Sequence, residues 1–373
     1  MAASPRPSED QVSARPPADP PPGADRLPIL DGHNDALLAL LRNPERPDSL
    51  LERSAIGHLD LPRAADGGFA GGFFALFTPS RRSTGPRPRD AAGPYELPFP
   101  PTPGVARAQR FTGALAARLF RDARASGGRL KVVRTLAELR DCLERGVCAA
   151  ILHIEGAEAI DPGLDALEVL YQTGLRSLGL VWSRPNAFGH GVPFKFPSSP
   201  DTGPGLTDLG RALVEACNQL GVLVDLSHLN EQGFWDVARL SQAPLVATHS
   251  NAHALCPSAR NLTDDQLRAI RESGGMVGLN FAVSMLRADG RPDAATPLEV
   301  MVRHLDHLIE RLGEDKVGFG SDFDGTIVPS AIKDAAGLQH LIAALREAGY
   351  DAPLLRRLAF ENWLRVLERT WAA

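Results

Sequence analysis

The amino-acid sequence predicts a (β/α)8 barrel, and three observations support this fold class. Short runs rich in Val, Ile, Leu and Phe recur along the 373 residues, stretches of helical period lie between them, and polar side chains suited to chemistry end several of the runs. Apolar runs that alternate with amphipathic helices are typical of a parallel sheet, and eight such units close into a barrel.

Eight apolar runs are predicted to be the barrel strands. In chain order they are 27–33 (LPILDGH), 71–77 (GGFFALF), 148–155 (CAAILHIE), 177–182 (SLGLVW), 221–228 (GVLVDLSH), 244–250 (PLVATHS), 275–281 (GMVGLNF) and 316–322 (KVGFGSD). Helices are predicted between them at 106–125, 163–173, 206–220, 231–240, 264–273 and 297–312. Two further helical stretches, 335–347 and 352–370, exceed the barrel count, and we expect them to cap or flank the barrel.

Two segments fall outside this pattern. Residues 1–27 are rich in Pro, Ala and charge and are predicted to be a disordered tail, which leaves 28–373 as a single barrel domain. Residues 78–105 are rich in Pro and Gly, and two interpretations stay open for them. They form either a long excursion on the C-terminal face of the barrel, as a partial lid, or a segment without order.

The composition excludes several classes of protein. With 43% hydrophobic and 23% charged residues the chain is typical of a globular protein, and its net charge of −5 argues against nucleic acid as a partner. We find no apolar stretch long enough for a signal-peptide core or a membrane span, and we expect no membrane partner. The four cysteines show no C-x-x-C spacing and are few for the length, which favours free thiols and a cytoplasmic location.

The first apolar run ends in the motif Asp31-Gly-His33-Asn-Asp35. Residues two apart on a strand project to the same side, so His33 and Asp35 are expected to point together at the barrel mouth. An imidazole nitrogen and a carboxylate oxygen suit a zinc-like ion. Taken alone, the pair is better explained by a buried, hydrogen-bonded histidine near a turn.

Four further strand ends carry similar groups. Glu155 ends the third run, His228 the fifth, His249 the sixth and Asp322 the eighth. Because the C-terminal ends of barrel strands converge on one face, these groups are predicted to meet His33 and Asp35 in one site. Six such groups exceed the three protein ligands of a typical catalytic zinc, which favours two metals. No lysine ends such a run, and Glu155 is therefore the expected bridging ligand.

These motifs, together with THSNAHALCPSARNLTDDQ and the late ENWLRV, resemble the membrane (renal) dipeptidase family of zinc metallopeptidases, within the amidohydrolase barrels. The resemblance runs from about residue 28 to residue 368, and its most specific part is 249–266. It implies two Zn²⁺ per chain. Its residue-by-residue implications are that His33 and Asp35 bind one zinc, that His228 and His249 bind the other, that Glu155 bridges them, that Asp322 is the catalytic aspartate, and that Arg260 holds the terminal carboxylate of the substrate.

The resemblance also implies an activity. A member of this family hydrolyses the peptide bond of L-Xaa–Xaa dipeptides, with a D-residue tolerated at the C-terminal position, by means of a hydroxide that bridges the metals. Asp322 would take up the proton and pass it to the departing amine. The ligand chemistry also allows Mn²⁺ or Co²⁺, and the family forms homodimers.

Arg260 lies in a loop just before a predicted helix, whose start is marked by the capping-box pair Thr263 and Gln266. A planar guanidinium at this place can clamp a carboxylate through two hydrogen bonds. The alternative is a surface ion pair with Asp264 or Asp265.

One position departs from the family. Members of the animal type carry a histidine at the end of the fourth strand that contacts the substrate carbonyl, and Trp182 occupies that place here. An indole donates one hydrogen bond but takes up no proton. Two alternatives therefore stay open: the same centre hydrolyses a non-peptide amide or a lactone, or the barrel holds metal and binds a peptide-like ligand without hydrolysis.

The other polar residues receive structural interpretations. Asp31, Asp225 and Asp324 are expected to orient the ligating histidines. His304 and His307 are expected on a solvated helix face. The remaining histidines, His58, His153, His190, His253 and His340, have no convergent partner in the sequence pattern or cap their own loops.

Overall fold

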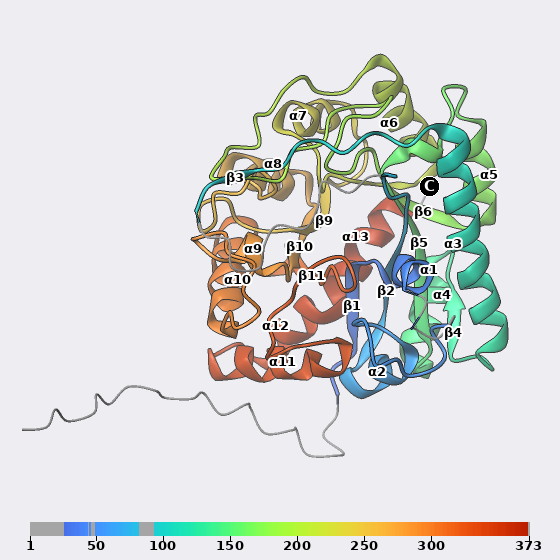
Figure 1. The fold of residues 1–373 in the computed structure, drawn as a ribbon. Coiled ribbons are helices and arrows are strands. Elements are labelled where there is room, and N and C mark those ends of the chain that lie inside the picture. The colour runs from blue at the N-terminus through green and yellow to red at the C-terminus, as the bar shows by residue number, and fades with distance from the viewer. Residues whose placement is uncertain (1–25, 44, 46–48, 82–92, 372–373) are drawn as a thin grey trace, which may run out of the picture.

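The computed structural model describes residues 26–43, 45, 49–81 and 93–371 (Figure 1). The predicted disordered tail, 1–27, lies outside the described residues except for its last two, as does 82–92 of the Pro/Gly-rich segment. Within the described part of the chain, no helix has the length and apolar character needed to cross a membrane.

Eight parallel strands form a closed barrel, which confirms the predicted fold class. They follow the order β1, β2, β5, β6, β8, β9, β10 and β11 around the ring, and β11 pairs with β1 to close it. Their bounds are β1 Ile29–Asn34, β2 Phe69–Phe77, β5 Cys148–Glu155, β6 Leu175–Gly179, β8 Leu223–Asp225, β9 Val246–Ser250, β10 Met276–Asn280 and β11 Val317–Gly320. The predicted runs agree with these strands to within about three residues at each end, the fourth run ending later than β6 does.

The helices surround this ring (Figure 1). Their bounds are α1 Ala36–Arg42, α2 Leu61–Gly67, α3 Val105–Ala125, α4 Leu136–Arg145, α5 Asp165–Thr173, α6 Asp208–Leu220, α7 Glu231–Leu240, α8 Asp264–Ser273, α9 Val283–Leu286, α10 Leu298–Leu312, α11 Leu338–Glu347, α12 Ala352–Arg356 and α13 Asn362–Trp371. Short 3-10 turns occupy Ala157–Ala159, Glu314–Lys316 and Ala335–Gly337, and a π-helical turn, Arg357–Glu361, joins α12 to α13. All six helices predicted between the strands are present; α1, α2, α4 and α9 were not predicted.

Three short strands lie outside the ring. β4 (Leu130–Val132) pairs with the first half of β5, whereas β6 pairs with the second half. β3 (Tyr95–Glu96) pairs antiparallel with β7 (Lys195–Phe196) and belongs to the predicted irregular segment 78–105. Figure 1 shows the chain running from β3 across the upper side of the molecule to α3.

The barrel is filled by apolar side chains and closed at one end by a tryptophan. Leu30, Phe73 and Ile151 pack in one buried cluster with Trp363 of α13. The Trp363 indole Nε1 donates to the carbonyl oxygen of Phe319 at 3.2 Å. A Cβ on Gly32 would lie 2.6 Å from the Trp363 ring, so glycine is needed where the ring meets β1. The last helix therefore caps the barrel, as predicted.

Candidate metal centre

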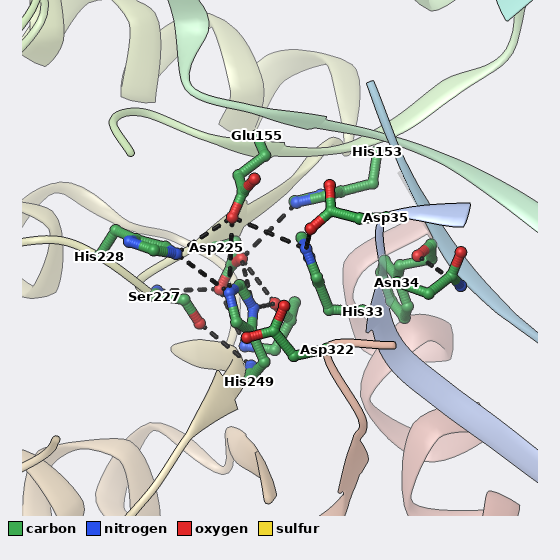
Figure 2. Close-up of polar contacts among 12 residues, drawn as sticks. His33, Asn34, Asp35, His153, Glu155, Asp225, Ser227, His228, His249 and Asp322 are labelled. Carbon is green, nitrogen blue, oxygen red and sulfur yellow. Dashed lines mark hydrogen bonds and ion pairs between the residues drawn. The ribbon is translucent and has the colours of Figure 1, made fainter. Parts of the chain in front are cut away.

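The six groups predicted at strand ends come together at the C-terminal end of the barrel. Figure 2 shows side chains from β1, β5 and β9, and from the segments that follow β1, β8 and β11, pointing toward one another. Asn34, between the two polar residues of the H-x-D motif, points away from the cluster and donates to the carbonyl oxygen of Phe73 at 3.2 Å. The cluster is formed by His33, Asp35, Glu155, His228, His249 and Asp322.

Glu155 lies at the centre of the cluster. Its Oε1 is 3.0 Å from His228 Nε2, 3.6 Å from His249 Nε2 and 3.7 Å from His33 Nε2. Two ligand atoms bound to one tetrahedral zinc are about 3.3 Å apart, so these separations suit shared coordination. One carboxylate therefore reaches histidines from both sides of the barrel mouth.

A second group of ligand atoms lies on the β1 side. His33, Asp35 and Asp322 each offer an atom within 4.8 Å of the others, and His33 also belongs to the group with Glu155 and His249. His33 Nε2 is 3.8 Å from Asp35 Oδ2. β1 ends at Asn34 and Asp35 is the N-cap of α1, yet both side chains of the motif still reach the cluster.

Two of the histidines are oriented by hydroxyl groups. His228 Nδ1 is 2.8 Å from Ser183 Oγ, and His249 Nδ1 is 2.8 Å from Thr248 Oγ1. The Thr248 hydroxyl donates to Asp225 Oδ2 at 2.6 Å, which leaves its oxygen to accept from the imidazole N–H. The His249 ring then presents an unprotonated Nε2 to the cluster, as a metal ligand requires. Asp225 thus orients the His249 ring through the Thr248 hydroxyl, the kind of contact expected for this aspartate.

His33 is held differently. It is fully buried, and neither of its ring nitrogens has a hydrogen-bond partner among the described residues. Its ring stacks on His249 with 3.9 Å between centroids. Asp35 Oδ1 is likewise buried without a partner. Buried polar atoms of this kind are costly unless something binds them, and a divalent cation suits this donor set.

The electrostatics of the cluster favour a cation. Burial raises the pKa of Glu155 well above its usual range. Burial alone would lower the pKa of His33, but Glu155, Asp35 and Asp322 raise it to about 10. Burial also raises the pKa of Asp322 to about 6. Burial therefore disfavours the ionised form of these carboxyl groups in the protein alone, and a divalent cation would favour it.

The backbone is strained at two of these residues. His228 has a φ of 69° and Asp322 a φ of 58°, both in the left-handed region that non-glycine residues seldom adopt. Such conformations persist where the surrounding structure enforces them, and they concentrate at functional sites. Asn280 Nδ2 donates to Asp322 Oδ2 at 3.0 Å and holds that carboxylate against the mouth.

The sequence pattern did not predict that His153 lies beside the ligand cluster. It precedes Glu155 by two residues on β5 and is fully buried beside the cluster (Figure 2). Its Nδ1 is 2.9 Å from Ser177 Oγ, and its Nε2 lies 3.7 Å from Asp225 Oδ2. The i, i+2 spacing to Glu155 was the available signal, because it places both side chains on the inner face of the strand.

Arg260 is buried rather than paired on the surface, so the alternative of an ion pair with Asp264 or Asp265 is wrong. Its side chain is 3% exposed, and its two terminal nitrogens donate to Ser250 Oγ at 3.0 Å and to the His249 carbonyl oxygen at 3.1 Å. Its Nε has no partner among the described residues. Asp264 instead pairs with His307 and Arg311. The predicted capping box that starts α8 is present.

Other predicted roles had mixed outcomes. The expectation that His304 is solvated is wrong, because its imidazole is buried and its Nε2 lies 2.9 Å from the Leu286 carbonyl oxygen. Asp31 bonds Ser321, through its backbone N–H at 2.6 Å and its hydroxyl at 2.9 Å, and so fixes the end of β11. Asp324 accepts from the His58 N–H at 2.7 Å.

The remaining histidines bond loop carbonyls. The contacts are His190 Nδ1 to Gly205 O at 3.2 Å, His253 Nε2 to Ser198 O at 2.9 Å and His340 Nδ1 to Ala331 O at 2.9 Å. None of these three belongs to the cluster of ligand atoms found among the described residues.

The cluster opens into a cavity of about 170 Å³ with one aromatic wall. Trp182 lies in this wall, 5.1 Å from Phe77, 5.4 Å from Phe194 and 5.8 Å from His228 between ring centroids. The buried Arg184 guanidinium sits 5.1 Å from the Trp182 ring. The remaining lining residues are Asp35, Leu38, Arg42, Glu155, Met285, Asp322, Asp324, Gly325 and Thr326.

Comparison with known proteins places this site in context. The model of the family "Membrane dipeptidase (Peptidase family M19)" matches residues 24–373. A Klebsiella pneumoniae protein described as an uncharacterized protein in the pqqA 5'region is 53% identical over 246 residues, which are 66% of this chain and 91% of that protein. An Acinetobacter calcoaceticus protein, uncharacterized and in the PQQ-III 3'region, is 41% identical over 288 residues, or 77% of this chain and 90% of that one.

A solved structure is also similar. The crystal structure of a metallo peptidase from Rhodobacter sphaeroides, liganded with a phosphinate mimic of the dipeptide L-Ala-D-Ala, is 58% identical in sequence. The match covers 93% of this chain and 100% of that one, with a TM-score of 0.89.

Proposed function

Because the chain belongs to the membrane dipeptidase family of metallopeptidases and is a metallo-dipeptidase, we propose that it binds two zinc ions and hydrolyses L-Xaa–Xaa dipeptides, including those with a C-terminal D-residue. The observation that carries the two-metal assignment is the position of Glu155, whose Oε1 lies 3.0 to 3.7 Å from three histidine nitrogens. The phosphinate bound to the Rhodobacter protein supports the choice of substrate.

The ligands divide into two sets that share Glu155. His33 and Asp35 would hold one ion, and His228 and His249 the other. When bound, such ions polarise the scissile carbonyl and activate a water molecule as nucleophile at neutral pH. Mn²⁺ or Co²⁺ suits the same nitrogen and oxygen donors.

Asp322 would move the proton. Its carboxylate is at the mouth of the barrel, and Asn280 Nδ2 holds one of its oxygens at 3.0 Å. The other oxygen is then free to accept a proton from the nucleophile and to donate it to the departing amine.

Arg260 would bind the C-terminal carboxylate of the dipeptide. Its guanidinium is fixed beside His249 by two hydrogen bonds, and its unpartnered Nε leaves donor capacity. A guanidinium held in this way recognises a carboxylate with defined geometry. The binding of that carboxylate would place the peptide bond over the metal ligands.

A second candidate activity is hydrolysis of a non-peptide amide or a lactone by the same centre. The observation that favours it is Trp182, which forms part of the cavity wall at the place where a histidine would contact a peptide carbonyl. Unlike a histidine, an indole at this place donates one hydrogen bond but takes up no proton.

One experiment separates these activities. Purified protein is assayed on L,L- and L,D-dipeptides and on non-peptide amides and lactones, and its metal content is measured by elemental analysis on the same sample. The proposal expects about two zinc ions per chain and turnover of dipeptides. Two ions with turnover of the non-peptide substrates alone would replace it with the second activity.

We also propose a cytoplasmic homodimer. The four cysteines are buried and free of disulfides, which supports a reducing compartment. Sedimentation velocity measures the oligomeric state directly, and a monomer at micromolar concentration would contradict the dimer.

A further inference from the structure

Arg42 lies at the rim of the cavity and has no role in the reaction proposed above. It is the last residue of α1, the helix that follows the His33–Asp35 strand, and it lines the cavity together with Leu38, one helical turn before it. Arg42 is exposed to solvent at this edge of the cavity. Among the described residues that line this cavity, Arg42 is the one arginine.

The Arg42 guanidinium makes no hydrogen bond or ion pair with any residue in the described part of the chain. Partial burial lowers its pKa, and Asp35 is the carboxylate that acts on it in the opposite direction. Asp35 belongs to the ligand cluster, where a bound metal ion would neutralise its negative charge. Asp324, also in the cavity lining, already accepts from backbone N–H groups of His58 and Leu59. Within the described residues, the Arg42 guanidinium thus has no carboxylate bound to it.

The two arginines of the site lie on opposite halves of the centre. Arg260 is fixed beside His249, on the β9 side, whereas Arg42 lies beyond Asp35, on the β1 side. A dipeptide whose C-terminal carboxylate binds Arg260 and whose peptide bond lies over the ligands must extend its N-terminal residue toward the β1 side. The side chain of that residue then faces Arg42.

We infer that Arg42 selects dipeptides whose N-terminal residue carries a carboxylate side chain, such as L-Glu-L-Ala or L-Asp-L-Ala. This inference rests on the proposed dipeptidase function and on the role of Arg260 within it. Arginine binds carboxylates through two parallel hydrogen bonds, and the partial burial of Arg42 strengthens such a pair relative to one on a fully open surface. The aromatic wall of Phe77, Trp182 and Phe194 offers no such partner.

The test compares near-isosteric substrates. The ratio of kcat/KM for L-Glu-L-Ala to that for L-Gln-L-Ala is measured with zinc-loaded wild type, Arg42→Gln and Arg42→Lys. Arg145→Gln is the matched control, because Arg145 also ends a helix, α4, and is 69% exposed away from the cavity. The pair L-Ala-L-Glu and L-Ala-L-Gln tests the other side-chain position.

We expect a Glu/Gln ratio of about ten or more for wild type and for Arg145→Gln, near one for Arg42→Gln, and intermediate for Arg42→Lys. The Ala-Glu/Ala-Gln ratio should stay near one throughout. A wild-type ratio near one, a ratio that survives Arg42→Gln, or an equal loss on all substrates would overturn the inference. The last outcome would assign Arg42 to the main-chain carboxylate or to the macrodipole of α1.

A binding measurement keeps the inference separate from the proposed function. Phosphinate analogues of Glu-Ala and Gln-Ala are titrated by calorimetry into wild type and Arg42→Gln. Tighter binding of the Glu analogue by about tenfold, lost in Arg42→Gln, supports the assignment of Arg42 even if no dipeptide is hydrolysed. If dipeptides are hydrolysed but the two analogues bind equally, the dipeptidase function stands and the role of Arg42 fails.

Discussion

The two sides of the candidate metal centre are built by different means. On the β8 and β9 side, hydroxyl groups hold the Nδ1 atoms of His228 and His249 at 2.8 Å. On the β1 side, His33 has no hydrogen-bond partner on either nitrogen among the described residues and is held by packing. One side is therefore preorganised by hydrogen bonds, while the other depends on the ion that binds there.

This difference has a consequence for metal binding. Partners that fix the tautomer and orientation of a ligating imidazole commonly change metal affinity by about 10- to 100-fold. The ion held by His33 and Asp35 should therefore leave first when a chelator is added, and the ion held by His228 and His249 should leave later. Two phases of zinc release from the wild type would support this order.

Glu155→Gln is expected to have the largest effect because Glu155 contacts the histidines of both sides. Loss of the negative charge should remove metal from both sides and lower kcat/KM by about a thousandfold or more. Elemental analysis and dipeptide turnover check this prediction, with the exposed Glu168→Gln on α5 as the control. Retention of two ions in Glu155→Gln would show that the two sides bind metal independently.

Asp322→Asn comes next in expected effect. Asp322 lies within 4.8 Å of the ligand atoms of His33 and Asp35 but is assigned to proton transfer. The amide keeps the size of the side chain and can still accept from Asn280, so both ions should stay bound while kcat falls by about 100- to 10,000-fold. Loss of one ion per chain would instead show that Asp322 is a metal ligand, which would add a third ligand to His33 and Asp35 on the β1 side.

Much of this centre was predictable from the sequence. Each ligand ends an apolar run, and the convergence of parallel strand ends follows from the barrel alone. A carboxylate such as Glu155 directly after a run like CAAILHI is a strong signal, because unpaired carboxylates are kept out of such runs.

Other features of the structure could not be predicted from the sequence. Trp363 closes the barrel floor through a contact with β1 more than 300 residues away in sequence, which no local periodicity encodes. The two-residue strands β3 and β7 are too short to show an alternation. The burial of Arg260 depends on β9 carbonyl and hydroxyl groups that only the folded chain brings near. His304 shares its helix with charged neighbours, yet it faces the α9 loop.

Thr248→Val tests the hydrogen-bonded side directly. Valine keeps the shape of threonine but removes the hydroxyl that links His249 to Asp225. We expect metal affinity on this side to fall by about 10- to 100-fold, so that the rates of the two phases of zinc release become more similar. Thr248→Ser keeps the hydroxyl and should retain the wild-type phases. Unchanged release in Thr248→Val would mean that the hydroxyl does not orient His249.

Trp182→Phe should have the smallest effect on the metals. Trp182 packs against His228 with 5.8 Å between ring centroids, whereas Ser183 supplies the hydrogen bond to that imidazole. If hydrogen bonding orients His228, the substitution should change zinc release by less than about threefold, while Ser183→Ala should accelerate it by about tenfold or more. Stopped-flow release to a chromogenic chelator measures both variants. A larger effect in Trp182→Phe than in Ser183→Ala would show that packing holds the imidazoles on both sides, and the contrast between His33 and His228 would then disappear.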